Sequence, residues 1–182
     1  MVLNRMLRKI LSLDSNSDFY KRNLSWTGRF VDRNLPIIQE NYKKFPNRNK
    51  WKCDCHVSHE DQFDVDRIDY EFLRKEYVKI SKKFCKERKL KFRHVSDVWY
   101  NYYETGQYQE PHDHGQVGYT AVHYLIFDPH YHEQTKFYDP GFVTPKVVEG
   151  DILFFAANKI HYVPPNNSTK PTLTIAFTLI VE

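Results

Sequence analysis

The clearest hydrophobic pattern in the chain lies between residues 69 and 89. Apolar side chains recur there at spacings of three and four, namely Tyr70, Leu73, Tyr77, Ile80 and Phe84. With Arg, Lys and Glu filling the other positions, this period predicts an amphipathic helix. Weaker versions of the pattern predict a helix over residues 1–12 and a short helix over 36–45. Residues 15–33 are polar and rich in turn formers, and residues 51–57 alternate as a strand does.

After residue 94 the pattern changes to short β-branched and aromatic runs separated by Gly, Pro, Asn and Asp. These runs cover residues 95–104, 119–127, 135–138, 152–155 and 172–181. Many short strands without helices between them predict a barrel or a two-sheet sandwich. We therefore expect an α+β fold in one domain, residues 1–182, since this length suits a single core. N-terminal helices within residues 1–94 would precede and buttress a jelly-roll β core, residues 95–182.

Charge divides the chain at about the same place. Residues 1–95 hold 23 Lys and Arg against 13 Asp and Glu, a net charge of +10. Residues 96–182 hold four lysines, no arginine and ten acidic residues, a net charge of −6. The basic half suits an acidic protein or a nucleic acid as partner, although a solvated helical face gives the same composition.

Two further features concern the compartment. No apolar run approaches the roughly 20 residues that span a bilayer. A secretory signal needs a continuous apolar region, whereas Arg8 and Lys9 interrupt the apolar residues at the start of this chain. Cys53, Cys55 and Cys85 are too few for a disulfide framework. We therefore expect a cytoplasmic protein without a membrane segment.

Three histidines in the β half are the strongest candidates for chemistry. His112 and His114 flank one residue, and His161 follows 47 residues after His114. In a strand, side chains at alternate positions point to the same face, so His112 and His114 can share one side while Asp113 points away. Two imidazoles on one face and a third supplied by the fold predict a metal centre with open positions.

Three segments around these histidines resemble one enzyme family. They read WYNYYETGQYQEPHDH at residues 99–114, AVHYL at 121–125, and EGDILFF with HYVP at 149–155 and 161–164. Their order and spacing resemble the 2-oxoglutarate/Fe(II)-dependent oxygenases. More narrowly, they resemble small oxygenases encoded by tailed phages and bacteria, which are similar to prolyl 4-hydroxylases. The resemblance implies a double-stranded β-helix core, Fe(II) and 2-oxoglutarate as cofactors, and a hydroxylase.

The resemblance also implies a ligand set, from which this chain departs. The family supplies His-x-Asp/Glu and a distant His, which leaves three metal positions open. Here His114 stands where the carboxylate is expected. We therefore expect His112, His114 and His161 to hold iron, with Asp113 as the alternative to His114 if a local turn redirects it.

For 2-oxoglutarate, the resemblance points to a cation that binds the distal carboxylate. Lys170, nine residues after His161, lies about where prolyl hydroxylases carry this cation, and Lys136 is the alternative. Tyr124 and Tyr102 match tyrosines that contact the co-substrate in the family. Thr174 shares a strand face with Lys170 and adds a hydroxyl donor.

The substrate is the least determined part of the prediction. The resemblance suggests a peptidyl proline or another protein side chain, whereas the basic half leaves nucleic acid open. Two other functions compete with this one. One is a cofactor-free three-histidine dioxygenase, whose small-molecule substrate ligates the iron. The other is a non-catalytic jelly-roll module of a phage, with a structural or binding role. The oligomeric state is left open.

Overall fold

The computed structural model describes residues 18–44, 53–58, 67–138 and 145–182. The helix predicted over residues 1–12 and the start of the strand predicted over 51–57 lie outside these ranges. The described elements, in chain order, are β1 (Tyr20–Asn23), α2 (Thr27–Lys44), β2 (His56–Val57), α3 (Tyr70–Arg88), β3 (Phe92–Tyr103), β4 (Gln109–His112), β5 (Tyr119–Ile126), β6 (Lys136–Phe137), β7 (Asp151–Ala156), β8 (His161–Val163) and β9 (Thr172–Val181).

Helix α3 confirms the helix predicted over residues 69–89. The Asp69 side chain precedes its first turn and accepts a hydrogen bond from the backbone N–H of Phe72 at 2.9 Å. Such a cap satisfies one of the N–H groups that have no partner within the helix. At the other end Lys89 adopts a left-handed conformation with φ of 56°, and its N–H bonds back to the last turn.

Helix α2 begins at Thr27, well before the helix predicted over residues 36–45, and it occupies part of a segment expected to be turns. The reason is that the buried face of α2 includes Asn34 and Asn41. These polar residues interrupt the helical spacing of apolar residues in the sequence. Asn34 donates to the Phe30 carbonyl at 2.8 Å and accepts from the Asp69 N–H at 2.9 Å, which joins α2 to the start of α3. Pro36 lies in the helix interior on an exposed side.

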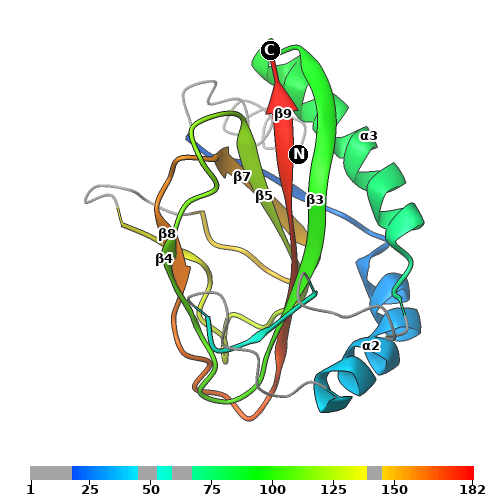
Figure 1. Cartoon of the computed structure of the whole chain (residues 1–182), viewed down its shortest axis with the longest axis vertical. Coiled ribbons are helices and arrows are strands. Elements are labelled where there is room, and N and C mark those ends of the chain that lie inside the picture. Colours follow the sequence, from blue (N-terminus) through cyan, green and yellow to red (C-terminus); the bar gives the residue numbers. More distant parts are fainter. Residues whose placement is uncertain (1–17, 45–52, 59–66, 139–144) are drawn as a thin grey trace, which may run out of the picture.

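Two antiparallel sheets form the β part of the molecule. The larger sheet has the strand order β1-β7-β5-β9-β3-β2, and the smaller has the order β4-β8-β6. All five predicted strands of the β half are present, whereas the short strands β4 and β8 were not predicted. Figure 1 shows α2 and α3 on one side of the larger sheet and β4 and β8 on the other. This mixed α/β architecture is consistent with the jelly-roll core expected from the sequence.

Each face of the larger sheet contributes to a separate hydrophobic cluster. Tyr100 and Tyr102 of β3 face the helices, where Tyr77 of α3 stacks on Phe177 of β9 with ring centroids 4.6 Å apart. Trp99, on alternate β3 positions from these tyrosines, belongs to the second cluster, between the two sheets. Within the described part of the chain, neither helix is long and apolar enough to cross a membrane.

Candidate metal centre

Three histidines converge between the smaller sheet and the larger one. The antiparallel register of β4 and β8 places His112 opposite His161. His114 lies two residues beyond the end of β4, and its backbone N–H bonds to the Ala157 carbonyl at 2.9 Å. One potential ligand atom from each imidazole lies within 4.8 Å of those of the other two. Among the described residues, this is the group of His, Cys, Asp or Glu side chains able to hold a metal ion.

Backbone carbonyls orient two of the imidazoles. His112 Nδ1 lies 2.8 Å from the Glu110 carbonyl, and His161 Nδ1 lies 2.8 Å from the Lys159 carbonyl. A carbonyl only accepts, so each Nδ1 carries the hydrogen and each Nε2 carries the lone pair. Hydrogen bonds of this kind fix the tautomer and ring direction of metal-binding histidines.

Burial keeps one of these histidines neutral. His161 is 3% exposed, and burial together with the neighbouring His112 lowers its pKa to about 3. Its ring centroid lies 4.4 Å from that of His112 and 5.2 Å from that of His114. A neutral imidazole is the form that binds metals, so His161 is in its ligating state at neutral pH.

Asp113 lies outside the histidine cluster. Its side chain is exposed, and its Oδ1 accepts a hydrogen bond from the backbone N–H of Gly115 at 3.0 Å. Gly115 has a φ of 93°, a conformation that glycine adopts without steric cost. The turn therefore holds the carboxylate away from the imidazoles.

A small cavity of about 20 Å³ adjoins the three histidines. Its walls combine apolar and uncharged polar side chains, namely Trp99, Asn101, Tyr103, Gln109, His112, His114, Val122, Thr135, His161, Val163, Thr174 and Ala176. No Lys, Arg, Asp or Glu of the described ranges belongs to this lining. The enclosed space suits about one water molecule, so a larger ligand would enter only with movement of side chains.

Uncharged hydrogen-bonding groups gather on the inner side of this cavity. Thr174 Oγ1 lies 3.4 Å from Asn101 Nδ2, and the Tyr124 hydroxyl donates to Thr135 Oγ1 at 3.0 Å. Register pairs Tyr124 with Thr174 across β5 and β9. The Asn101 Oδ1 atom is buried and has no hydrogen-bond partner in the part of the chain described. A buried polar atom without a partner is a group that a bound ligand or water can satisfy.

The remaining predicted co-substrate residues lie elsewhere. Tyr102 faces α2, with its ring centroid 5.4 Å from that of Tyr42. Lys170 is exposed, and its Nζ lies 3.8 Å from the centroid of the Tyr131 ring. Lys136 pairs with Glu133 at 2.7 Å. The structure thus places Thr174 in the wall of the cavity beside the histidines, with Tyr124 bonded to another residue of that wall, Thr135. Tyr102, Lys170 and Lys136 do not belong to this lining.

Sequence reasoning missed Asn101 and Thr135. Asn101 had a detectable signal, because alternation from Trp99 places residues 99, 101 and 103 on one face of β3. Thr135 had none, because it precedes the two-residue strand β6 and its position depends on tertiary contacts.

No family model and no curated protein matches this chain. Solved structures do share its fold. A prolyl-4-hydroxylase from Pseudomonas putida superposes with a TM-score of 0.69 at 13% identity, covering 94% of this chain and 98% of that one. The carbocyclase SnoK of nogalamycin biosynthesis, which is non-heme and α-ketoglutarate dependent, gives 0.64 at 12% identity, covering 93% and 83%.

A third neighbour was solved with a peptide bound. It is a prolyl hydroxylase from Trichoplax adhaerens in complex with a fragment of the hypoxia inducible factor oxygen degradation domain. Its TM-score is 0.62 at 11% identity, covering 98% of this chain and 91% of that one. These neighbours confirm, at the level of the fold, the resemblance to prolyl hydroxylases and other 2-oxoglutarate-dependent oxygenases.

Proposed function

We propose that residues 1–182 form one Fe(II)- and 2-oxoglutarate-dependent dioxygenase domain that hydroxylates a C–H bond. The observation that carries the proposal is the convergence of His112, His114 and His161 within the fold of prolyl hydroxylases. Iron and 2-oxoglutarate would supply the oxidising chemistry together with O₂. The protein has to hold the metal, orient the co-substrate and position the substrate hydrogen.

The three histidines suit iron as ligands. With His112 and His161 protonated at Nδ1, each keeps Nε2 as the atom that would bind the metal. Three imidazoles leave the other coordination positions to co-substrate and oxygen. The site has no carboxylate ligand, so it carries one negative charge fewer than a His-x-Asp centre. Metal affinity therefore depends on imidazole alone, and the bound dianion of 2-oxoglutarate would neutralise the ion.

For the co-substrate, the cavity offers uncharged donors. We infer that Thr174 and the amide of Asn101 bind the distal carboxylate, with Tyr124 behind them through its hydrogen bond to Thr135. Lys170 would have to leave the Tyr131 ring to take part. Hydroxyl and amide groups hydrogen-bond a carboxylate less strongly than a charged guanidinium or ammonium does, so we expect weaker co-substrate binding than a cationic clamp gives.

As substrate we infer a proline or another side chain within a protein. The support is the prolyl hydroxylase fold and the peptide held by the Trichoplax neighbour. The buried residues Cys53, Cys55 and Cys85 form no disulfide, which fits a reducing compartment such as the cytoplasm of a cell or of a phage host.

An anaerobic titration tests the metal and the co-substrate separately. Fe(II) is added first, and uptake is measured by calorimetry. 2-Oxoglutarate follows, and its chelation is read from a metal-to-ligand charge-transfer band in the visible spectrum. O₂ is then admitted, and turnover is measured as succinate released and as a gain of one oxygen atom in proline-containing peptides. Uptake followed by the band is the expected result, and a protein that takes up no iron refutes the proposal.

Adjacent substitutions identify the ligands. His114→Ala should weaken Fe(II) binding by more than about tenfold, because even outer-shell losses reach that size. Asp113→Ala is the matched control and should leave the affinity unchanged, because its exposed carboxylate bonds only within its own turn. The opposite ranking would make Asp113 the ligand.

A second pair of variants tests the clamp. Thr174→Val should weaken 2-oxoglutarate binding without changing Fe(II) uptake, because it removes one buried hydroxyl and keeps the side-chain shape. Lys170→Ala should leave both affinities unchanged, because the ammonium contacts Tyr131. A loss in Lys170→Ala alone would restore the lysine clamp predicted from the sequence.

One observation favours a second candidate function, a cofactor-free three-histidine dioxygenase whose small-molecule substrate binds the iron. The described lining of the cavity contains no cation for a dicarboxylate. Iron uptake without a charge-transfer band at millimolar 2-oxoglutarate would favour this second function.

A further inference from the structure

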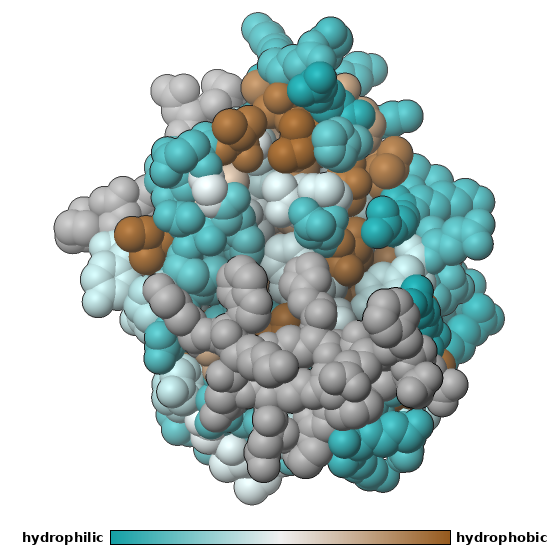
Figure 2. Space-filling model, viewed as in Figure 1, coloured by the Kyte–Doolittle hydropathy of each residue, from teal (hydrophilic) through white to brown (hydrophobic). Residues whose placement is uncertain are grey.

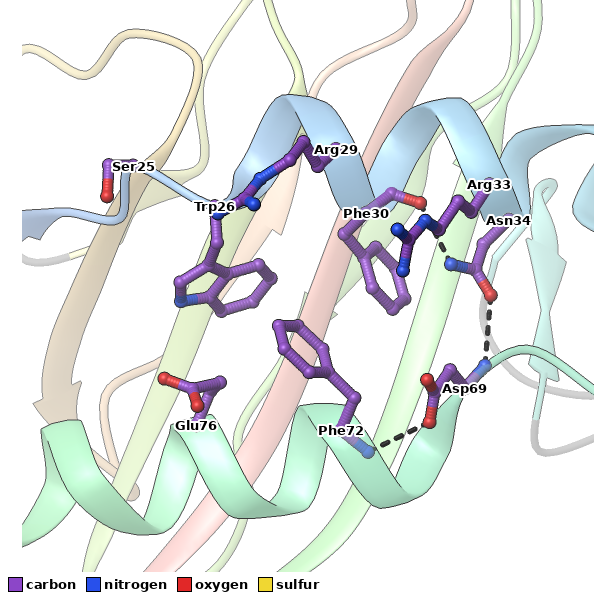
Figure 3. A pocket seen from close by; sticks show the side chains of 9 residues that line it. All are labelled: Ser25, Trp26, Arg29, Phe30, Arg33, Asn34, Asp69, Phe72 and Glu76. Atoms are coloured by element: carbon purple, nitrogen blue, oxygen red, sulfur yellow. Dashed lines mark hydrogen bonds between the residues drawn. The ribbon is translucent and has the colours of Figure 1, made fainter.

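A larger cavity lies between α2 and α3, on the helical side of the larger sheet. Its volume is about 330 Å³, within the range of about 300 to 1,000 Å³ typical of small-molecule sites. The three histidines belong to the opposite side of that sheet, so this cavity is separate from the candidate metal centre. Figure 3 shows aromatic rings of both helices pointing into it and charged side chains at its edges.

Two arginines line one wall of the cavity. Arg29 and Arg33 lie one turn apart on α2 and are exposed. Neither makes a hydrogen bond or an ion pair with the described part of the chain. The carboxylates across the cavity are already engaged, because Asp69 caps α3 and Glu76 pairs with Lys79 at 2.5 Å. With Glu76 paired to Lys79, only the Asp69 carboxylate offsets the two arginines, so the described lining keeps a net positive charge and favours an anion as its ligand.

Aromatic rings form the body of the cavity. Trp26 meets Phe72 edge to face with centroids 5.1 Å apart, and the planes of Phe30 and Phe72 are within 15° of parallel. Behind Trp26, the His123 ring lies 5.0 Å away and supports the indole. Trp26 and Phe72 remain partly exposed. Such rings suit a planar ligand, because bases stack on aromatic side chains whatever their sequence.

Positive charge continues from the cavity along α3. Besides Lys79, which pairs with Glu76, the helix presents exposed lysines over three turns, at Lys75, Lys82, Lys83 and Lys86. In Figure 2, hydrophilic side chains cover the side of the molecule that α3 occupies. A row of lysines of this length suits successive phosphates of a strand better than one isolated anion.

We propose that the α2–α3 cavity binds a nucleotide, with the base against Trp26 and Phe72 and a phosphate on Arg29 and Arg33. A single strand would supply further phosphates to the α3 lysines. Because the binding needs neither iron nor 2-oxoglutarate, the proposal stands apart from the proposed function.

Fluorescence anisotropy with a labelled oligothymidylate of about 12 nucleotides tests the site. The double variant Arg29→Gln/Arg33→Gln should weaken binding about tenfold, and the slope of log K against log salt should become shallower by about 0.7, because one phosphate contact is lost. Lys43→Gln/Lys44→Gln is the matched control, because it removes the same charge from exposed positions at the other end of α2. Circular dichroism confirms that both variants are folded.

Competition separates the sources of the nucleotide. Displacement of the strand by thymidine monophosphate supports a site that also accepts free nucleotides. Binding of the strand without such displacement supports a site for the polymer. Failure of the wild-type protein to bind the strand overturns the proposal, as does an equal loss in both double variants. Tighter binding of an acidic peptide through the same two arginines also overturns it, in favour of a protein partner.

Discussion

The buried imidazole of His123 should make the protein less stable in mild acid. The residue is 0% exposed in the middle of β5, and its ring joins three elements. His123 Nε2 lies 2.9 Å from Thr27 Oγ1 on α2, and Nδ1 lies 2.9 Å from the Tyr77 hydroxyl on α3. Thr27 gives its own hydrogen to the Leu24 carbonyl at 2.6 Å. Therefore His123 donates from Nε2 and accepts at Nδ1, which only the neutral ring can do.

The size of the effect follows from linkage. Burial lowers the pKa of His123 to about 3 in the folded protein, against about 6.5 in an unfolded chain. Below pH 6.5 the unfolded state therefore binds a proton that the folded state does not, and stability falls as the pH falls. At about 1.36 kcal/mol per pKa unit, the loss is roughly 2 kcal/mol at pH 5 and roughly 3 kcal/mol at pH 4. Above pH 6.5 the contribution is constant.

Urea denaturation of wild type and His123→Gln, at pH 7.5 and pH 5.0, measures this term. Glutamine does not titrate, and contributions from the other ionisable groups cancel in the difference between the two proteins. We expect the change in pH to cost wild type about 2 kcal/mol more than the variant. His94→Gln is the matched control, since His94 is exposed on β3. Equal pH dependence in wild type and His123→Gln would refute the buried neutral histidine.

Three other substitutions test the local geometry of the backbone. Gly118→Ala should cost at least about 2 kcal/mol and lower Tm by about 5 °C, because φ is 88° and the added Cβ would lie 2.3 Å from the Leu179 carbonyl oxygen. Gly28→Ala, with open space around it in α2, should instead stabilise by up to about 1 kcal/mol, and a similar Tm for both variants would contradict the packing. Asp69→Ala should cost about 1 kcal/mol in urea denaturation, because it removes the cap on the Phe72 N–H, and no loss would mean that water replaces the cap.

A helix could be predicted from the sequence where its buried residues are apolar, and it was missed where some of its buried residues are polar. In α3, every third or fourth residue is both apolar and buried, and the helix was found within one residue at each end. In α2, by contrast, Asn34 and Asn41 are buried and hydrogen-bonded. Strands β4 and β8 have four and three residues, which is too short to show a recognisable alternation of apolar and polar residues. Their positions follow from tertiary pairing, which the local sequence does not encode.

The candidate site separates in the same way, into histidines brought together by local spacing and a neighbouring cavity formed by tertiary structure. His112 and His114 are neighbours along the chain, so their meeting needed only an extended backbone and one register with His161. The pocket depended on which face of β3 looks inward, and a shift of one residue exchanges the faces. This is why Asn101 lines the cavity while Tyr102 packs against the helices. Lys170 precedes β9 on a loop. The alternation of side chains along a strand does not apply there, so the direction of this long side chain could be learned only from the structure.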